Sequence, residues 1–288
     1  MDPQKSPRTA ESTGDPVTGA RSPGGGPDRF AAGRDLTRWT TPPGRLAARW
    51  THRLSIVLGP HAALALQLIV GAVVALLLTI ASAGIYDAVT EGDGVATLDY
   101  PLLDAAMALR SPTLDTLVTG FTNIGGPIGM PILAVAIMVF LAARRRSWTP
   151  VVLIVAAASG SLLMTIVGKQ FIDRARPPLT DAVPPYEYSA SFPSGHSLNA
   201  LVIAGIVAYL VLLRQSTRRA AVVTILLAAI FAVSMGLSRV YLGHHWFTDV
   251  LVAGTLGATW LALVITAHRL YLTGRQRVEA ETAASHTQ

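Results

Sequence analysis

Long runs of apolar residues begin at Ala62 and recur to residue 267. Each run approaches the roughly 20 residues that an α-helix needs to cross a hydrocarbon core of about 30 Å. The fourth and fifth runs are short, so we expect both helices to extend into their flanks. The pattern predicts an all-α membrane protein, a six-transmembrane-helix bundle with spans at 62–86, 125–143, 149–168, 197–213, 220–237 and 248–267.

Two regions lie outside these runs. The segment "DYPLLDAAMALRSPTLDTLVTGFTNIGG" is half polar and predicts short amphipathic or interfacial helices. Residues 1–60 are rich in Pro, Gly, Ser and Arg, which is typical of a disordered tail, and they hold no apolar segment of a secretory signal. We therefore predict a cytoplasmic tail at 1–60, a membrane domain at 61–270 and a short cytoplasmic tail at 271–288.

Composition supports a membrane protein. Hydrophobic residues make up 51% of the chain and charged residues 14%, against roughly 25% charged residues in soluble domains. The chain has no cysteine, which excludes disulfides, thiolate metal sites and a cysteine nucleophile. A net charge of +6 would fit a nucleic-acid-binding protein, so the distribution of this charge decides between the two classes.

The positive residues are unevenly distributed among the predicted loops. Nine Lys and Arg lie in the N-terminal tail, and three each lie at 144–146, within 214–219 and after His268. With six spans all eighteen fall on one side, which the positive-inside rule identifies as the cytoplasm. We therefore expect a multi-pass protein of the cell membrane with both termini in the cytoplasm, and no nucleic-acid partner.

Five cations remain on the opposite, extracytoplasmic side. The positive-inside rule disfavours cations there, so we infer that a function retains them. The predicted spans carry no charge in mid-membrane, which argues against a proton-coupled transporter. The polar chemistry is therefore concentrated at the outer end of the bundle, around Arg110, Lys169, Arg174, Arg176 and Arg239.

The first polar cluster is "GKQFIDRARPP", at the outer end of the third span. Lys169 and Arg176 are seven residues apart, so on a continuing helix they would share one stripe before Pro177 and Pro178 end it. Two like charges repel unless an anion lies between them, and arginine suits the oxygens of phosphate. The alternative is contact with lipid headgroups, with Asp173 neutralising Lys169.

The second cluster is "SFPSGHS", where a loop turns into the fourth span. Pro193 and Gly195 favour a tight turn, and Ser194 offers a hydroxyl. The backbone N–H groups at the start of a helix form an anion site, and His196 at its edge could give a proton to a leaving oxygen. The alternative for His196 is a capping or surface residue.

The third cluster is "SRVYLGHHWFTD", between the fifth and sixth spans. On a helix His245 and Asp249 would lie one turn apart, so the carboxylate could hold the imidazole and fix its tautomer. His244 is poorly placed for that pairing, and we interpret it as a polar residue at the membrane interface beside Trp246. Together the three clusters predict a phosphate site with a nucleophile, a proton donor and Arg239 as a further cation.

These clusters resemble the signature of the type 2 phosphatidic acid phosphatase superfamily, the integral-membrane lipid phosphate phosphatases. That family carries the motifs KX6RP, PSGH and SRX5HX3D, which match residues 169–177, 193–196 and 238–249 completely and in order. The six-span layout extends the resemblance over most of 62–270. No position of the signature departs from the pattern.

The resemblance implies a role for each signature residue. His245 would attack phosphorus and form a phosphohistidine, with Asp249 orienting it, and His196 would protonate the leaving group and then activate water. Cations and amides would fill the role of a metal, so neither metal nor cofactor is expected. The non-bridging oxygens would be held by Lys169, Arg176, Ser194, Gly195 and Arg239.

The resemblance further implies a membrane lipid phosphatase that hydrolyses a phosphomonoester or pyrophosphate of a lipid at an extracytoplasmic active site. An outer-leaflet substrate favours a polyprenyl diphosphate such as undecaprenyl diphosphate, with phosphatidic acid or phosphatidylglycerol phosphate as the close alternative. A lipid phosphotransferase would use the same phosphohistidine. A non-catalytic lipid-binding protein would usually lack a signature residue, and none is missing here. The oligomeric state stays open.

Overall fold

The computed structural model describes residues 94–285 continuously, with side chains to residue 276, and only isolated positions before residue 94. Two strands, β1 (Phe30–Ala31) and β2 (Arg34–Asp35), pair antiparallel. All other described elements are helices, which confirms the predicted helical fold for this part of the chain. They are η1 (Gly94–Leu98), α2 (Asp99–Ala108), α3 (Pro112–Ile124), α4 (Gly129–Arg145), α5 (Thr149–Phe171), η2 (Leu179–Asp181), α6 (Gly195–Leu212), α7 (Arg218–Tyr241) and α8 (Phe247–Ser285).

Four of these helices, α5 to α8, are long and apolar enough to cross a membrane. Helices α3 and α4 pass the same test together, although they are bent by 50° relative to each other. The described residues therefore hold four spans, or five if the bent pair is one. The first predicted span, 62–86, and the predicted tail at 1–60 lie outside the continuously described residues, so the count of six stays a prediction.

The bend between α3 and α4 corrects the predicted second span. That span was expected over 125–143, but the membrane helix begins at Gly129 and the residues before it form a turn. The sequence "GGP" at 125–127 explains the break, because glycine is a poor helix former and proline removes a backbone donor. As predicted, the half-polar segment before it forms short helices, α2 and α3.

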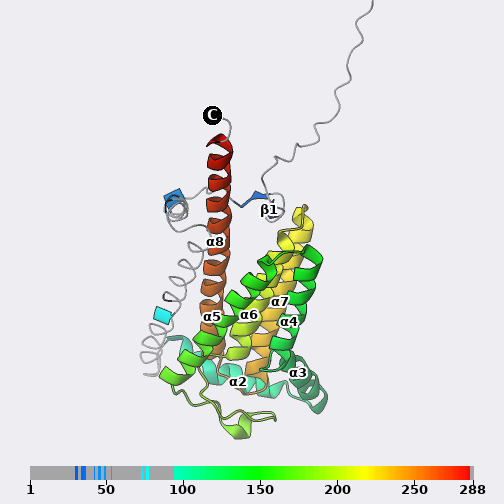
Figure 1. Ribbon diagram of the computed structural model, residues 1–288. Coiled ribbons are helices and arrows are strands. Elements are labelled where there is room, and N and C mark those ends of the chain that lie inside the picture. The colour runs from blue at the N-terminus through cyan, green and yellow to red at the C-terminus, as the bar shows by residue number, and fades with distance from the viewer. Residues whose placement is uncertain are drawn as a thin grey trace, which may run out of the picture.

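Helices α4 to α8 run alongside one another, while α2 and α3 lie across one end of this bundle (Figure 1). The segment 172–194, which joins α5 to α6, lies at the same end. Both helices that were expected to lengthen do so, since α6 begins at Gly195 and α7 ends at Tyr241. The last helix is longer than expected and runs on to Ser285.

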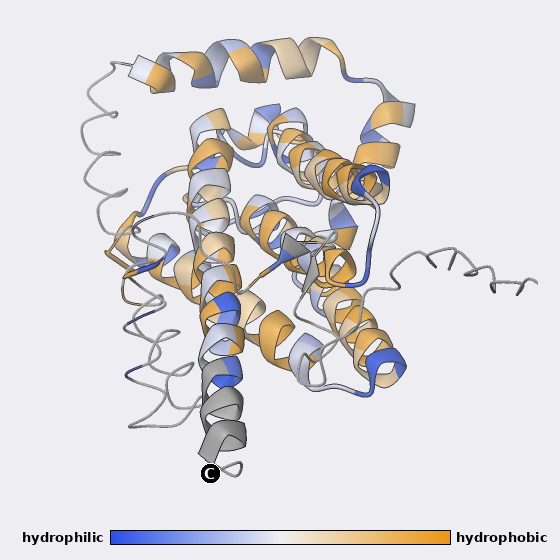
Figure 2. Cartoon of the chain, turned by 90° about the horizontal axis from the view of Figure 1, so that it is seen from above, coloured by the Kyte–Doolittle hydropathy of each residue, from blue (hydrophilic) through white to orange (hydrophobic). Residues whose placement is uncertain are grey.

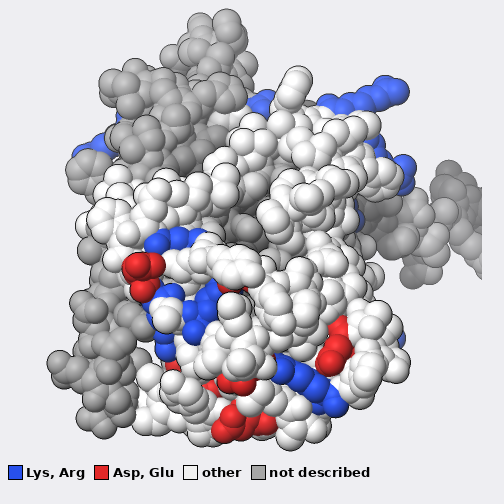
Figure 3. Space-filling view, turned by 90° about the horizontal axis from the view of Figure 1, so that it is seen from below, with Lys and Arg blue, Asp and Glu red and all other residues white. Residues whose placement is uncertain are grey.

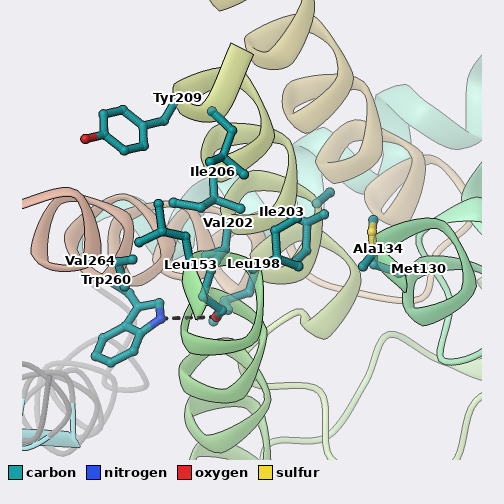
Figure 4. Close-up of a cluster of buried hydrophobic side chains, with 14 of the residues drawn as sticks. Met130, Ala134, Leu153, Leu198, Val202, Ile203, Ile206, Tyr209, Trp260 and Val264 are labelled. Carbon is teal, nitrogen blue, oxygen red and sulfur yellow. Dashed lines mark hydrogen bonds between the residues drawn. The ribbon is translucent and has the colours of Figure 1, made fainter. Parts of the chain in front are cut away.

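Helix α6 is the centre of the bundle and packs against α5, α7 and α8. Its side chains Leu198, Val202 and Ile206 are fully buried, and Figure 4 shows them pointing into the cluster formed with the neighbouring helices. Trp260 of α8 lies at the edge of this cluster and donates a hydrogen bond to the Ala157 carbonyl of α5, at 3.1 Å. The tryptophan thereby buries its ring without leaving its N–H unpaired.

Small residues permit this close packing of α5 and α8. A side chain at Gly160 would collide with the ring of Trp260. At the polar end, a side chain at Gly168 would collide with Pro193, which precedes α6. These two glycines therefore set how closely α5 approaches α8 and the start of α6.

The faces of the bundle that point outward are also apolar. Helix α7 exposes Val223, Leu227 and Ile230, each more than half accessible. Figure 2 shows hydrophobic residues along the bundle helices and hydrophilic ones mainly near their ends and in the connecting loops. A helix that is hydrophobic on all sides is typical of a membrane span, so the described chain is a multi-pass membrane protein.

Candidate functional site

Residues of all three sequence clusters meet at the end of the bundle that carries α2 and α3. The C-terminal ends of α5 and α7 and the N-terminal ends of α6 and α8 lie there, together with the segment 172–194. Figure 3 looks onto this end and shows Lys and Arg side chains next to Asp and Glu on a surface that is otherwise mostly uncharged. Because neighbouring helices run antiparallel, residues as far apart in the chain as Lys169 and Asp249 come together in one site.

Lys169 and Arg176 converge, but not as predicted. Helix α5 ends at Phe171, so the two cations do not share a helical stripe. Instead both reach the segment before α6: Lys169 Nζ donates to Ser189 Oγ at 3.1 Å and to the Ala190 carbonyl, and Arg176 Nε donates to the Ser189 carbonyl at 2.7 Å. Pro177 disfavours helical geometry at Arg176 and lacks a backbone donor, so no helix continues from Lys169 past Arg176.

The second cluster forms the start of α6. Ser194 is the N-cap: its Oγ accepts from Ser197 N at 3.5 Å and contacts Ser197 Oγ at 2.8 Å. The hydroxyl that was expected to hold phosphate is therefore buried and used as a helix cap. Gly195 and His196 follow it at the N-terminus of the helix, and both line the large cavity described below.

His245 and Asp249 face each other at the start of α8. His245 precedes the helix, which begins at Phe247, and its Nδ1 lies 3.5 Å from Asp249 Oδ2. The same carboxylate oxygen accepts the backbone N–H of Trp246 at 3.0 Å, as an acidic residue in the first turn of a helix commonly does. Both residues are buried, His245 at 1% exposure and Asp249 at 0%.

A network that the sequence did not reveal holds Asp249 in place. Ser191 Oγ donates to Asp249 Oδ2 at 2.5 Å, and Arg174 Nη1 donates to Asp249 Oδ1 at 2.6 Å. Arg174 also forms an ion pair with Asp99 at 2.7 Å, and Asp99 accepts from Thr248 N at 2.9 Å. This chain of contacts ties α2 and the segment after α5 to the first turn of α8, and fixes the carboxylate beside His245.

The contacts of His245 define its tautomer. Nδ1 faces Asp249 and Ser191 Oγ, whereas Nε2 lies 3.3 Å from the Arg176 guanidinium, which has no acceptor. The proton therefore belongs on Nδ1 and the lone pair on Nε2. Burial first, and then the charges of Arg176 and Arg239, hold the pKa of His245 well below its usual value, so the ring is neutral at pH 7.

Arg239 and Arg176 share one carboxylate. Glu187 forms an ion pair with Arg176 Nη2 at 2.9 Å through Oε2 and a second one with Arg239 Nη2 through Oε1. Burial disfavours the charged form of Glu187, but the two guanidinium groups outweigh it and lower the pKa of the carboxyl to about 2. The two arginines of the sequence signature are thus bridged by an anion from the chain itself.

His244 corrects the expectation of a residue at the membrane interface. Its side chain is buried, and its Nε2 lies 2.7 Å from the Val183 carbonyl. Burial first, and then the charge of Arg239, lower its pKa to about 4. Trp246, its expected partner at the interface, is also buried, with its Nε1 donating to the Ala175 carbonyl at 2.9 Å.

A cavity of about 810 Å³ joins this polar site to the apolar part of the bundle. Lys169, Glu187, His196 and His245 line its polar end. Residues of α4, α5 and α6 line the rest, mostly with apolar side chains. These include Met130, Ala134, Met138, Ile154, Leu162 and Ile203.

Four residues of the site were not predicted from the sequence. For Arg174 the sequence contained one indication, its place among the five cations on the predicted outer side. Glu187 lies between the first and second motifs and belongs to neither. Asp99 is 150 residues from Asp249 in the chain, and Ser191 looks like an ordinary loop serine.

In the part of the chain that the structure describes, no group of three His, Asp or Glu is placed to hold a metal ion.

Comparisons with known proteins agree on one family. The model of the PAP2 superfamily matches residues 149–271. Phosphatidylglycerophosphatase B of Bacillus subtilis (strain 168) is 34% identical over 174 residues, which cover 60% of this chain and 84% of the relative. The crystal structure of a transmembrane PAP2-type phosphatidylglycerolphosphate phosphatase from Bacillus subtilis matches with a TM-score of 0.58 at 30% identity, covering 66% of this chain and 93% of that one.

Proposed function

This chain belongs to the PAP2 superfamily and is a membrane lipid phosphatase, and we propose that it works through a phosphohistidine formed on His245. One observation carries the proposal. His245 has its Nδ1 toward Asp249 and its Nε2 toward Arg176, at the polar end of a cavity that continues between apolar helices. A lipid phosphate has this same division into an anionic head and an apolar tail.

In the first step Nε2 of His245 attacks phosphorus. An N–P bond forms while the bond from phosphorus to the lipid oxygen breaks, and His196, protonated while the anionic phosphate is bound, gives its proton to that leaving oxygen. Asp249 stabilises the imidazole as its charge grows, because it faces the Nδ1–H. Lys169, Arg176 and Arg239 balance the charge on the non-bridging oxygens, with the amides at the start of α6.

In the second step a water molecule attacks the phosphohistidine. His196 takes the proton of this water, the N–P bond breaks, and inorganic phosphate leaves with Nε2 of His245 restored. Both steps use His196 at the same place, the N-terminus of α6, where it lines the cavity. A lipid or sugar hydroxyl in place of water would make the enzyme a phosphotransferase.

Two lipids are candidate substrates. Phosphatidylglycerol phosphate is supported by the names of the relative and the solved structure, which are 34% and 30% identical to this chain. A polyprenyl diphosphate is supported by the position of the site. The arginines within 144–146 and 214–219 lie at the ends of α4, α6 and α7 that are remote from the site. By the positive-inside rule the site then faces the outer leaflet.

Phosphate release by the purified chain against a panel of lipids tests this function. Phosphatidylglycerol phosphate, phosphatidic acid and a polyprenyl diphosphate are compared, and products are analysed for free phosphate or a phosphorylated acceptor. We expect free phosphate to be released at the same rate when EDTA is present, and we expect vanadate to inhibit this release. A strict requirement for Mg²⁺ would contradict the proposal.

Two histidine variants test the mechanism. His245→Ala removes the nucleophile, so hydrolysis should fall by about a thousandfold or more. His244→Ala should keep much of the activity, because this ring faces the Val183 carbonyl and not Asp249. Equal and complete loss in two variants that are both folded would exclude His245 as the specific nucleophile.

A further inference from the structure

An anionic side chain already occupies the cations that we assign to phosphate. Arg176 and Arg239 both pair with Glu187, whose carboxylate also lies 4.0 Å from His244 Nδ1. Arg176 in turn contacts Nε2 of His245 at 3.3 Å. The Arg176 guanidinium thus lies between the Glu187 carboxylate and Nε2 of His245. A phosphate placed for attack by this nitrogen would therefore contact the same arginines that Glu187 contacts.

The residues after Glu187 occupy the other cation. Lys169 contacts Ser189 Oγ and the Ala190 carbonyl, and the Arg176 guanidinium donates to both the carbonyl and the Oγ of Ser189. The segment 187–190 therefore covers the phosphate-binding groups of the first and third motifs. It is also the most exposed part of the site, with Tyr188 82% accessible and the Glu187 side chain 30% accessible.

A ligand has to displace this carboxylate to reach the arginines. Glu187 offers one negative charge and two oxygens, and a phosphodiester group offers the same. A phosphomonoester carries about 1.5 to 2 negative charges at pH 7 and three terminal oxygens, and a diphosphate also exceeds one charge. The carboxylate thus competes evenly with a diester and is outcompeted by a monoester or a diphosphate.

We propose that Glu187 is a specificity-determining residue, which excludes phosphodiesters from the site and admits phosphomonoesters and diphosphates. The proposal rests on the proposed function, since it assigns a charge requirement to the same phosphate site. Most lipids around the protein are phosphodiesters, so a site without this competing anion would be occupied by the bilayer itself. The low pKa of Glu187 keeps the competing charge in place at every physiological pH.

Binding of two soluble ligands to the purified full-length protein in detergent tests the proposal. Inorganic phosphate stands for the monoester and diethyl phosphate for the diester, and both affinities are measured by thermal shift. The wild type should bind phosphate and should bind diethyl phosphate at least about tenfold more weakly. Because either ligand has to displace the carboxylate, Glu187→Gln should tighten both by a similar factor of about tenfold or more, the size of a charge-assisted contact. Diethyl phosphate should then bind the variant about as well as phosphate binds the wild type.

Three variants complete this design. Glu187→Ala is a second neutral variant should the glutamine variant fail to fold. Glu187→Asp, which keeps the charge, should keep both affinities near those of the wild type. Asp181→Asn removes one charge from the same loop, 172–194, but outside the segment 187–190, at a carboxylate that contacts Thr180, and should change neither affinity.

The opposite outcomes overturn the inference. If the neutral variants bind both ligands more weakly, Glu187 merely positions the arginines, and if diethyl phosphate binds unchanged, Glu187 does not select. Since the readout is binding, a wild type that binds phosphate with this selectivity but hydrolyses no lipid refutes the proposed function alone. A wild type that does not bind phosphate refutes both.

Discussion

At the scale of single residues, the carboxylates of the site are each paired with arginine. Asp249 is paired with Arg174, and Glu187 with Arg176 and Arg239. His245 lies between the two groups and stays neutral. Removing one member of a buried pair leaves the other uncompensated, which costs several kcal/mol in typical proteins. The pairs therefore determine how firmly His245, the proposed nucleophile, is held.

Arg174 is a positioning residue for Asp249. Arg174→Gln should lower kcat by about tenfold to a hundredfold, since small displacements of a catalytic group cost that much, and should change KM little. Asp99→Asn should lower kcat in the same direction. Because both act through one chain of contacts, the double variant should lose less than the two single losses combined.

Steady-state kinetics of the four proteins measures this coupling. Arg218→Gln is the matched control, because it removes an exposed arginine at the start of α7, at the far end of the bundle. Full additivity of the two single variants would show that Asp99 and Arg174 act separately.

The pKa of His244 predicts how stability depends on pH. The native pKa is about 4 and the ordinary value is 6.5, so between these limits the unfolded chain binds a proton that the native one does not. Stability should therefore fall as the pH drops from 6.5 to 4, by about 3 kcal/mol at most from this residue.

Thermal unfolding in detergent at several pH values checks the sign. In His244→Gln, which keeps a donor for the Val183 carbonyl, the loss of apparent Tm on acidification should be smaller than in the wild type. A variant that loses as much Tm as the wild type over this range would rule out the buried imidazole as the cause.

At the scale of elements, hydropathy predicted the long helices well and their connections poorly. Helices α5 to α8 were recognisable because burial in a bilayer demands about 20 apolar residues in a row. The bend at 125–128 depends on a few Gly and Pro residues, which an average over a window conceals, and α5 ends at Phe171, several residues before Pro177. His245 and Asp249 were paired correctly because they are close in sequence.

The parts of the site that the sequence did not reveal come from long-range contacts. Asp99 reaches Thr248 and Arg174 only after α2 has folded across the end of the bundle. No spacing rule connects residues so far apart in the chain. The motifs therefore supplied the side chains that we propose act on phosphate, and packing determined which side chains hold them in place.

The contact between α5 and α8 gives a stability prediction. Gly160→Ala should destabilise the protein by about 1 to 3 kcal/mol, because the added methyl group meets the rigid ring of Trp260. Gly254→Ala on α8 is the matched control, since a methyl group there has nothing within 4 Å. Denaturation in detergent compares the two variants, and equal stability would mean that α5 and α8 tolerate a wider separation.

At the scale of the whole molecule, the bundle has two chemically different ends. The site lies at one end, while Arg144, Arg145 and Arg218 lie at the other. Arg110 links the elements at the site end. It donates hydrogen bonds to the Tyr241 carbonyl at the end of α7 and to the Asp181 carbonyl in the segment 172–194. This polarity supports our proposal that the headgroup is hydrolysed at the polar end while the lipid tail lies between helices.

Cysteine labelling tests which side each end faces. The chain has no cysteine, so single substitutions at Tyr188 and Trp148, which are 82% and 80% exposed at opposite ends, give clean reporters. A membrane-impermeant maleimide should label Tyr188→Cys in intact cells and Trp148→Cys only after permeabilisation. The reverse pattern would place the site in the cytoplasm.

The position of Trp246 gives the protein an intrinsic optical probe. Its indole donates to Ala175 between the two arginines of the loop, and its ring lies 5.6 Å from the Arg174 guanidinium and 4.9 Å from Tyr100. Movement of this loop changes the surroundings of the ring, and therefore its emission. Trp260, buried between α5 and α8, supplies a reference that the ligand does not touch. A ligand that moves this loop should therefore shift the tryptophan emission, and replacing the three tryptophans other than Trp246 and Trp260 isolates the two signals.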